Sequence, residues 1–280
     1  MNAPEQIALG LLPTMPAEVY HSILAMSAGG LKRMRQSPAH FFGVQMDPTR
    51  PTGGKPTPAM ENGTLVHTAL FEPHALAERY VVQPAGFDGR TKEGKAWLAS
   101  LPTDGLSVQA INATQLAAAN AQAAAVRALP EVAALLLDGA PETSAFWIDE
   151  QTGELCKCRP DWTSPAGEGV ILVDGKTCQD ASADGFGRAI WNWCYHLQAA
   201  WYSDGYERAT GKRVHGFVFA AVESAWPHAA AAYMLDDEVL DRARDENRRL
   251  LNLYAECKRT GIWPGYQQSI QSIALPAWAR

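Results

Sequence analysis

Two aspartates and one lysine stand at the ends of predicted β-strands. Asp161 lies near the end of a strand predicted at residues 155–162, and Asp174 lies near the end of the next one, VILVDGK at residues 170–176. Because side chains alternate along a strand, Asp174 and Lys176 share one face of it. If the two strands pair, both carboxylates meet at one edge of a sheet.

Charged side chains at the end of so apolar a strand need a compensating partner, because burying an isolated charge is costly. A divalent cation would compensate them, and carboxylate oxygens favour Mg²⁺, for which Mn²⁺ would substitute. Lys176 could then hold or deprotonate an attacking water, or stabilise negative charge on a phosphate. The other interpretation is an ordinary Asp174–Lys176 ion pair that caps the strand.

The helix predicted at residues 183–208 carries two adjacent stripes with helical spacing. The first is Trp191, Tyr195, Gln198 and Tyr202, and the second is Ile190, Cys194, Leu197 and Trp201. Two such stripes make a wide buried face. Gln198 is polar and therefore needs a hydrogen-bond partner within that face. The partner is either a group of a reactive centre (a carboxylate, water or nucleotide) or a backbone carbonyl.

A histidine lies on the apolar helix predicted at residues 59–71. His67 follows Gly63 by about one helical turn. A lone histidine on such a helix is most often a core residue with a satisfied hydrogen bond. Its imidazole can also serve as a metal ligand.

The elements that must position these residues predict an α/β protein. Strands are predicted at residues 143–149, 155–162, 170–176, 214–223 and 230–235, and helices at 59–71, 112–129, 183–208 and 236–259, with a short helix from Pro130. We expect a central mixed sheet flanked by helices, with a helical N-terminal elaboration. Residues 1–280 are predicted to be one domain: a mainly helical part (1–140), the catalytic sheet and helix (141–235), and a C-terminal helix and tail (236–280).

Taken in order, the motifs of the chain resemble the RecB-type branch of the PD-(D/E)xK nuclease superfamily. They are Gly-x-x-x-His ending at His67, Arg-Pro-Asp ending at Asp161, Asp-Gly-Lys-Thr from Asp174, and Tyr-x-x-Gln-x-x-x-Tyr from Tyr195 to Tyr202. Within that branch the chain looks most like RecE-type (exonuclease VIII) nuclease domains, whose opening the segment at residues 20–41 also resembles. The matching segments run from about residue 19 to 205.

The resemblance implies a PD-(D/E)xK core and a Mg²⁺-dependent 5′→3′ exonuclease. Such an enzyme degrades one strand of linear double-stranded DNA and leaves 3′ single-stranded tails. The metal ligands implied are His67, Asp161, Asp174 and the Gly175 carbonyl. The catalytic residues implied are Asp161, Asp174, Lys176, Gln198 and Tyr202. Lys176 would position the attacking water, while Gln198 and Tyr202 would support the site or contact the DNA.

The resemblance also implies partners. Relatives form homo-oligomeric rings that enclose DNA, and they act with a RecT-type single-strand annealing protein in prophage or phage recombination. A 5′-end specificity would need a pocket for a terminal phosphate, for which Arg33, Arg35 and Ser37 are the candidates. A helix start with nearby arginines can hold phosphate. A solvent-facing basic helix is the other interpretation of the same residues.

The formal net charge of −6 argues against a generally basic, nucleic-acid-coating surface, although a DNA path needs only a local stripe of cations. No run of residues reaches the roughly 18 apolar positions of a membrane helix. Residues 1–12 lack the pattern of a secretory signal, so we expect a cytoplasmic protein without a membrane partner. The five cysteines are expected to be reduced thiols, with a zinc clip at Cys156 and Cys158 as the alternative.

Two other functions are compatible with these residues. The first is a structure-specific or restriction-type endonuclease of the same superfamily, which would cut closed circular DNA. The second is a catalytically inactive DNA-binding accessory protein of recombination, which would be inert on linear duplex DNA in Mg²⁺.

Overall fold

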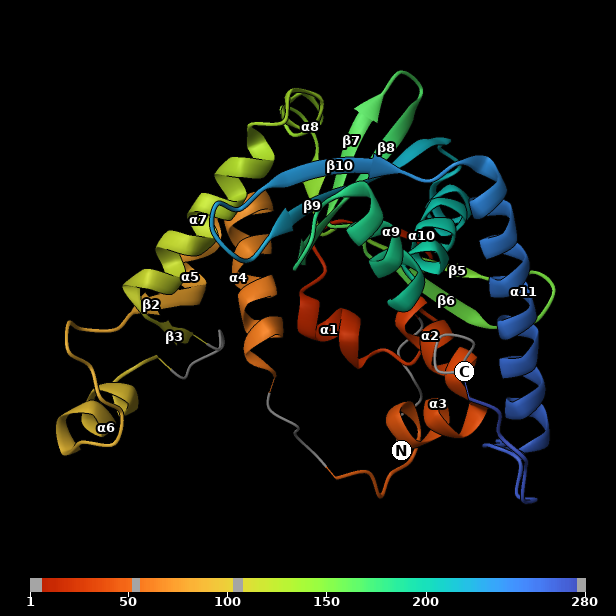
Figure 1. Ribbon diagram of the computed structural model, residues 1–280. Helices are drawn as coiled ribbons and strands as arrows, with labels where there is room; N and C mark the ends of the chain where they lie inside the picture. Colours follow the sequence, from red (N-terminus) through yellow and green to blue (C-terminus); the bar gives the residue numbers. More distant parts are fainter. Residues whose placement is uncertain (1–6, 52–55, 103–107, 276–280) are drawn as a thin grey trace.

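The computed structural model describes residues 7–51, 56–102 and 108–275. Its largest sheet has the strand order β10-β9-β8-β7-β4 (Figure 1). These strands are β4 (Ala140–Pro141), β7 (Trp162–Ala166), β8 (Gly169–Cys178), β9 (Val214–Glu223) and β10 (Ala230–Met234). β8 and β9 run parallel, and the other neighbouring pairs are antiparallel. The predicted mixed sheet is thereby confirmed.

β8 lies at the centre of this sheet because its residues are apolar on both faces. Leu172 packs against one helical layer and Val173 against the other, and neither residue is exposed. Strands covered on both faces are expected to be continuous apolar runs. Asp174 at the end of this run is consequently carried into the interior, where it is buried.

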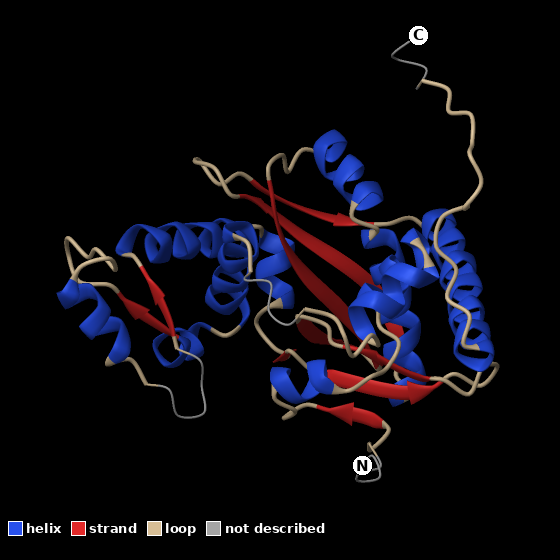
Figure 2. Cartoon of the chain, turned by 90° about the horizontal axis from the view of Figure 1, so that it is seen from below, coloured by secondary structure: helices blue, strands red, loops and turns tan. Residues whose placement is uncertain are grey.

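Helices cover both faces of the sheet, as the sequence predicted (Figure 2). On one face lie α4 (Pro58–Phe71) and α7 (Ala113–Arg127), which share a core with β8 and β9. On the other lie α9 (Ala183–Asn192) and α10 (Tyr195–Thr210). α11 (Asp237–Thr260) packs along α10 at the outside. In the part of the chain that the structure describes, no helix is long and apolar enough to cross a bilayer.

The remaining elements lie mostly before residue 140. The helices are α1 (Ala17–Ser22), α2 (Ala28–Gln36), α3 (Pro38–Gln45), η1 (Pro73–Ala75), α5 (Leu76–Arg79), α6 (Lys92–Ala99) and α8 (Pro130–Leu135). The strands are β1 (Gly10–Leu12), β2 (Tyr80–Val82), β3 (Gln109–Ile111), β5 (Ser144–Ile148) and β6 (Leu155–Cys158). β2 and β3 form a separate parallel pair.

The strand predicted at residues 155–162 is wrong as a single element. Its first part is β6, which belongs to a separate sheet of order β1-β5-β6, and its end begins β7 of the central sheet. The chain changes sheets at residues 159–161, where Pro160 has no backbone N–H to extend a ladder. The strand predicted at 143–149 likewise lies in the small sheet, as β5.

The single helix predicted at residues 183–208 is also wrong, because α9 ends at Asn192 and α10 begins at Tyr195. Between them Cys194 adopts a left-handed conformation with φ of +53°, which interrupts the helical hydrogen bonding. The Arg35 guanidinium donates to the Cys194 thiol at 3.2 Å and thereby contacts the junction. Trp191 therefore leaves the predicted buried stripe and is 61% exposed.

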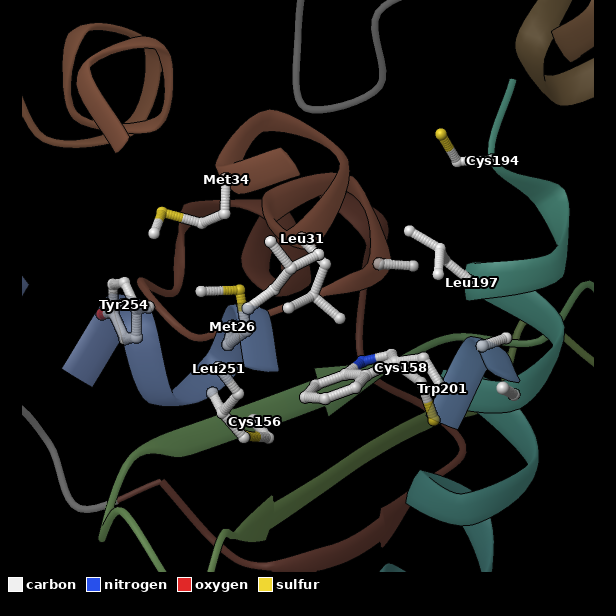
Figure 3. Packing of buried hydrophobic residues seen from close by; sticks show 14 of the residues in the cluster. Met26, Leu31, Met34, Cys156, Cys158, Cys194, Leu197, Trp201, Leu251 and Tyr254 are labelled. Atoms are coloured by element: carbon white, nitrogen blue, oxygen red, sulfur yellow. The ribbon is translucent and has the colours of Figure 1, made fainter. Parts of the chain in front are cut away.

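Cys156 and Cys158 lie in the core between β6, α2, α10 and α11, close to Met26 and Trp201 (Figure 3). Neither cysteine is exposed. Burial raises the pKa of the Cys156 thiol to about 12, and it raises that of Cys158 further. This burial matches the prediction of buried thiols, and among the described residues no further His, Cys, Asp or Glu joins the two cysteines in a possible metal site.

Arg248 of α11 holds the turn between β5 and β6 through a two-pronged ion pair. Its Nη1 and Nη2 lie 2.9 and 2.8 Å from the two oxygens of Asp149. Burial alone would raise the pKa of Asp149, but hydrogen bonds from Arg248 and Thr152 lower it to about 2. The pair therefore stabilises the fold above pH 4, and this stability is lost as the pH falls toward 2.

We expect Arg248→Ala to lower the free energy of unfolding by about 3–5 kcal/mol, because it leaves the buried Asp149 carboxylate unpaired. Arg249→Ala is the control, since Arg249 is 64% exposed and lies 3.7 Å from Glu246; it should cost less than about 1 kcal/mol. Urea unfolding at pH 7 measures both. Equal losses in the two variants would contradict a structural role of the Asp149 pair.

Candidate active site

Asp161 and Asp174 are brought together by the antiparallel pairing of β7 and β8. Trp162, the first residue of β7, pairs with Val173 of β8. Because the two strands are antiparallel, Asp161, which precedes Trp162, lies beside Asp174, which follows Val173. Asp161 precedes β7 rather than ending a strand, which corrects the predicted position. The backbone N–H of Gly175 donates to Asp161 Oδ2 at 2.8 Å. Both carboxylates thus meet at one edge of the sheet, as expected.

The Asp174 carboxylate is held at both oxygens. Gln198 of α10 donates from Nε2 to Oδ1 at 2.6 Å, and the Lys176 ammonium contacts Oδ2. Burial lowers the pKa of Lys176, but the Asp174 and Asp161 carboxylates outweigh it and the net shift is upward. Lys176 is accordingly a protonated donor. The polar partner that Gln198 required is therefore a carboxylate, and not a backbone carbonyl.

His67 reaches the site from α4, which lies on the face of the sheet opposite to α10. Its Nε2 lies 2.7 Å from the Gly175 carbonyl oxygen, and its Nδ1 lies 3.4 Å from Asp161 Oδ2. Burial lowers the pKa of His67, while Asp161 raises it and the net shift is upward. This close approach needs a glycine at 175, because a Cβ there would lie 3.0 Å from the Phe71 ring and 3.3 Å from the imidazole.

Glu142 is a further carboxylate at this site, and the sequence analysis missed it. Ligand atoms of His67, Glu142 and Asp161 all lie within 4.8 Å of one another. Glu142 has a φ of +51° and accepts from Arg159 Nε at 2.6 Å. In the sequence Glu142 is recognisable only as a carboxylate just before β5. Its backbone N–H donates to the Asp161 carbonyl at 3.0 Å, but this contact depends on the fold.

The donor set fits a divalent cation. Burial and then the neighbouring Asp174 carboxylate raise the pKa of Asp161, so negative charge is crowded and poorly solvated here. A cation that binds oxygen ligands would relieve this crowding. The set offers carboxylates from Asp161, Asp174 and Glu142, the Gly175 carbonyl and one imidazole, which suits Mg²⁺ or Mn²⁺ better than a thiolate-seeking metal.

A cleft lies beside the site, on the side of α1 and α4. Its volume is about 870 Å³. Its lining includes Thr64 and His67 of α4, together with Glu142 and Arg159. A substrate phosphate in this cleft would therefore meet His67 and Glu142, whereas Asp161, Asp174 and Lys176 do not line it.

Tyr202 lies one helical turn beyond Gln198 on α10. Its ring packs edge-on against Phe217 at 6.2 Å. Burial raises its pKa well above the usual value, and the Asp174 and Asp161 carboxylates add to this. Tyr202 therefore lies beside the carboxylates as a neutral phenol, and its catalytic role stays a prediction.

The three candidates for a terminal-phosphate pocket are already engaged in the fold. Ser37 is 6% exposed, and its hydroxyl lies 2.6 Å from His40 Nδ1 while it caps α3. Arg35 pairs with Glu246 at 2.8 Å, and Arg33 donates to the Gly29 carbonyl at 3.2 Å. A phosphate would have to displace these contacts.

Lys32 is the cation of α2 that faces the carboxylate site. Its ammonium lies 5.0 Å from the centre of the Tyr195 ring, and the Lys176 ammonium lies 4.9 Å from the same ring. Burial and then Lys176 lower the pKa of Lys32 to about 8. The sequence showed Lys32 only as part of a basic helix, since its neighbour Tyr195 lies on a distant segment.

Comparisons with known proteins bear on this site. Residues 27–276 match a protein family described as a PDDEXK-like domain of unknown function (DUF3799). No curated protein sequence matches the chain. A solved structure from Eubacterium rectale, described as a candidate exonuclease, is similar over 95% of this chain and 97% of its own, at 14% identity and a TM-score of 0.63.

Two further solved structures align less well. SSO0001 is 15% identical over 69% of this chain and 88% of its own, with a TM-score of 0.29. VC1899 from Vibrio cholerae is 12% identical over 72% of this chain and 52% of its own, with a TM-score of 0.22.

These findings support the PD-(D/E)xK superfamily that the motifs predicted, without distinguishing its RecE-type members. The family match spans most of the chain and contains every residue of the carboxylate site. The chain belongs to the PDDEXK-like domain family DUF3799.

Proposed function

We propose that the protein is a metal-dependent deoxyribonuclease whose site comprises Asp161, Asp174, Lys176 and His67. The observation that carries this proposal is the crowding of two buried carboxylates and a protonated lysine at one sheet edge, next to His67 and Glu142, which line a cleft. A bound Mg²⁺ would supply electrophilic activation of the phosphate and lower the pKa of a bound water.

Each residue of the site has a distinct role in this proposal. Asp161, Asp174 and the Gly175 carbonyl would hold the metal, with His67 and Glu142 completing its surroundings. Lys176, as an ammonium, would orient the attacking water and stabilise charge on the phosphate. Gln198 would position Asp174 by holding its Oδ1, which leaves the other oxygen for Lys176 and the metal.

The finer proposal is a 5′→3′ exonuclease that degrades one strand of linear duplex DNA and leaves 3′ tails. Two considerations support it: the motif resemblance to RecE-type nucleases and the similar fold of the Eubacterium rectale protein. The same proposal includes a ring of identical subunits, an annealing partner of the RecT type and a role in recombination. It also includes a cytoplasmic setting and a single nuclease domain over residues 1–280.

The test is a time course on linear duplex DNA with one phosphorylated and one blocked 5′ end. In Mg²⁺ we expect digestion to proceed only from the phosphorylated end, while closed circular duplex stays intact. Ca²⁺ should support binding with little cleavage, because it is larger and coordinates less strictly. Cleavage of the closed circle would instead favour an endonuclease, and digestion from the 3′ end would contradict the proposed polarity.

A further inference from the structure

Two tryptophans at the junction of α9 and α10 are exposed although they lie near the proposed site. Trp191 is 61% exposed and Trp193 is 65% exposed. Isolated exposed apolar residues are common, but two exposed indoles within three residues of chain leave a large apolar area in water. α9 ends at Asn192, between the two, and the left-handed Cys194 follows Trp193 directly.

We call this pair the indole platform (Trp191 and Trp193), and two side chains contact its first member, Trp191. The guanidinium of Arg35 lies 5.1 Å from the centre of the Trp191 ring. The imidazole of His196 stacks on Trp191 at 5.4 Å with an interplanar angle of 9°. Trp191 is therefore held in place on one side and still presents most of its surface to solvent.

The platform is connected to the carboxylate site through Tyr195. Tyr195, the first residue of α10, follows Trp191 by four residues, and the ammonium groups of Lys32 and Lys176 lie 5.0 and 4.9 Å from its ring centre. Lys32 and Arg35 lie one turn apart on α2 and so share a face. Three cations, Lys176, Lys32 and Arg35, thus lie between the carboxylate site and Trp191.

Aromatic faces next to a line of cations are the elements that bind single-stranded nucleic acid, with bases on the rings and phosphates on the cations. We propose that the indole platform binds unpaired bases of a DNA strand whose phosphates contact Lys32 and, by displacing Glu246, Arg35, beside the phosphate to be cleaved. The proposal rests on the nuclease function proposed above and names the form of DNA that lies at the site: a strand separated from its complement.

The charge pattern favours DNA over a second copy of this chain as the occupant. The cation that contacts the platform is Arg35, and Lys32 lies one helical turn from it on α2, whereas burial lowers the pKa of His196 and so disfavours its charged form. Glu246 is the carboxylate paired with Arg35, at 2.8 Å. A polyanion with flat bases complements these groups. A protein surface would need matching carboxylates of its own.

The test measures binding of the full chain in EDTA, so that no cleavage occurs. The probes are a fluorescein-labelled oligothymidylate and an abasic strand of equal length, which has the phosphates without the bases. We expect Trp191→Ala/Trp193→Ala to weaken oligothymidylate binding about tenfold or more while abasic binding is unchanged, since stacking depends on the base. Trp191→Phe/Trp193→Phe should retain most of the affinity.

Trp226→Ala is the matched control, because Trp226 is 83% exposed in the turn between β9 and β10, away from the platform. It should bind both strands as the wild type does. Trp193→Ala alone, at an exposed position, gives a second variant whose folding is not at risk. Equal affinity of all variants, or an equal loss on the abasic strand, would overturn the proposal.

Light scattering of the same variants addresses the competing occupant. A change of oligomeric state with unchanged oligothymidylate binding would assign the platform to a subunit contact and overturn the proposal. Cleavage of duplex DNA is assayed separately. Base-dependent binding without any cleavage would refute the nuclease function and keep the platform, whereas cleavage with platform variants that behave as wild type would refute the platform alone.

Discussion

Lys176→Ala is expected to reduce Mg²⁺-dependent cleavage of linear duplex DNA by about a thousandfold or more. Loss of one preorganised donor that stabilises transition-state charge typically costs on the order of 100- to 1,000-fold. Here the same change also removes the partner of Asp174 Oδ2 and so disturbs a metal-binding carboxylate. Single-turnover cleavage rates, measured with excess enzyme, report this step directly.

Lys258→Ala provides the matched control for this variant. Lys258 also pairs with a carboxylate, Glu154 at 2.5 Å, but lies 47% exposed on α11. It should cleave at the wild-type rate. Circular dichroism and unfolding curves verify that the Lys176→Ala and Lys258→Ala variants are folded. This check is needed because Lys176→Ala removes a partner of the buried Asp174, whereas Lys258→Ala does not. Full activity of Lys176→Ala would refute the assignment of the site.

Asp161→Asn is expected to abolish cleavage and at the same time to stabilise the metal-free protein. Burial and the Asp174 carboxylate raise the pKa of Asp161, so its ionised form is disfavoured in the folded state. An asparagine removes that charge, and its amide oxygen can still accept from the Gly175 N–H. The gain at pH 8 should be on the order of 1–2 kcal/mol.

The pH dependence of this gain follows from the sign of the shift. An acid whose pKa is higher in the folded state binds more protons there than in the unfolded chain. Stability therefore falls as the pH rises from about 4, the ordinary carboxyl pKa, toward neutrality. In EDTA, the stability difference between Asp161→Asn and the wild type should be larger at pH 8 than at pH 5, as measured by urea unfolding.

A divalent cation should stabilise the wild type more than the Asp161→Asn variant. Binding to the folded state alone stabilises it by mass action, so Mg²⁺ should raise the melting temperature of the wild type more than that of Asp161→Asn. Asp138→Asn, a change at an exposed position, should alter neither quantity. A metal-free Asp161→Asn protein less stable than wild type at pH 8 would contradict the crowding of charge at this site.

Local periodicity was sufficient to predict part of the site from sequence. The apolar run before Asp174 predicts a strand buried on both faces, and the two-residue alternation places Lys176 beside that carboxylate. Helical spacing placed Gln198 within a buried face and implied a polar partner for it. These inferences hold because they depend only on residues within one strand or one helix.

Contacts between distant segments decided the rest. The partner of Gln198 is 24 residues away in sequence, and Arg35 meets Glu246 across 211 residues. Glu142 joins the carboxylates only because β4 and β7 pair, and Lys32 faces the site only because α2 packs against α10. No spacing rule encodes such encounters, since they depend on how whole elements pack.

The sequence by itself therefore determined which side chains could do the chemistry and which of them share an element: the buried strand with Asp174 and Lys176, and the helix with Gln198. Only the tertiary structure decided where elements begin and end against their neighbours. At Pro160 the chain passes from the small sheet to the central sheet. At Cys194 a left-handed residue interrupts the predicted helix, and Trp191 is exposed. Both breaks depend on the surrounding packing, which local propensity does not contain.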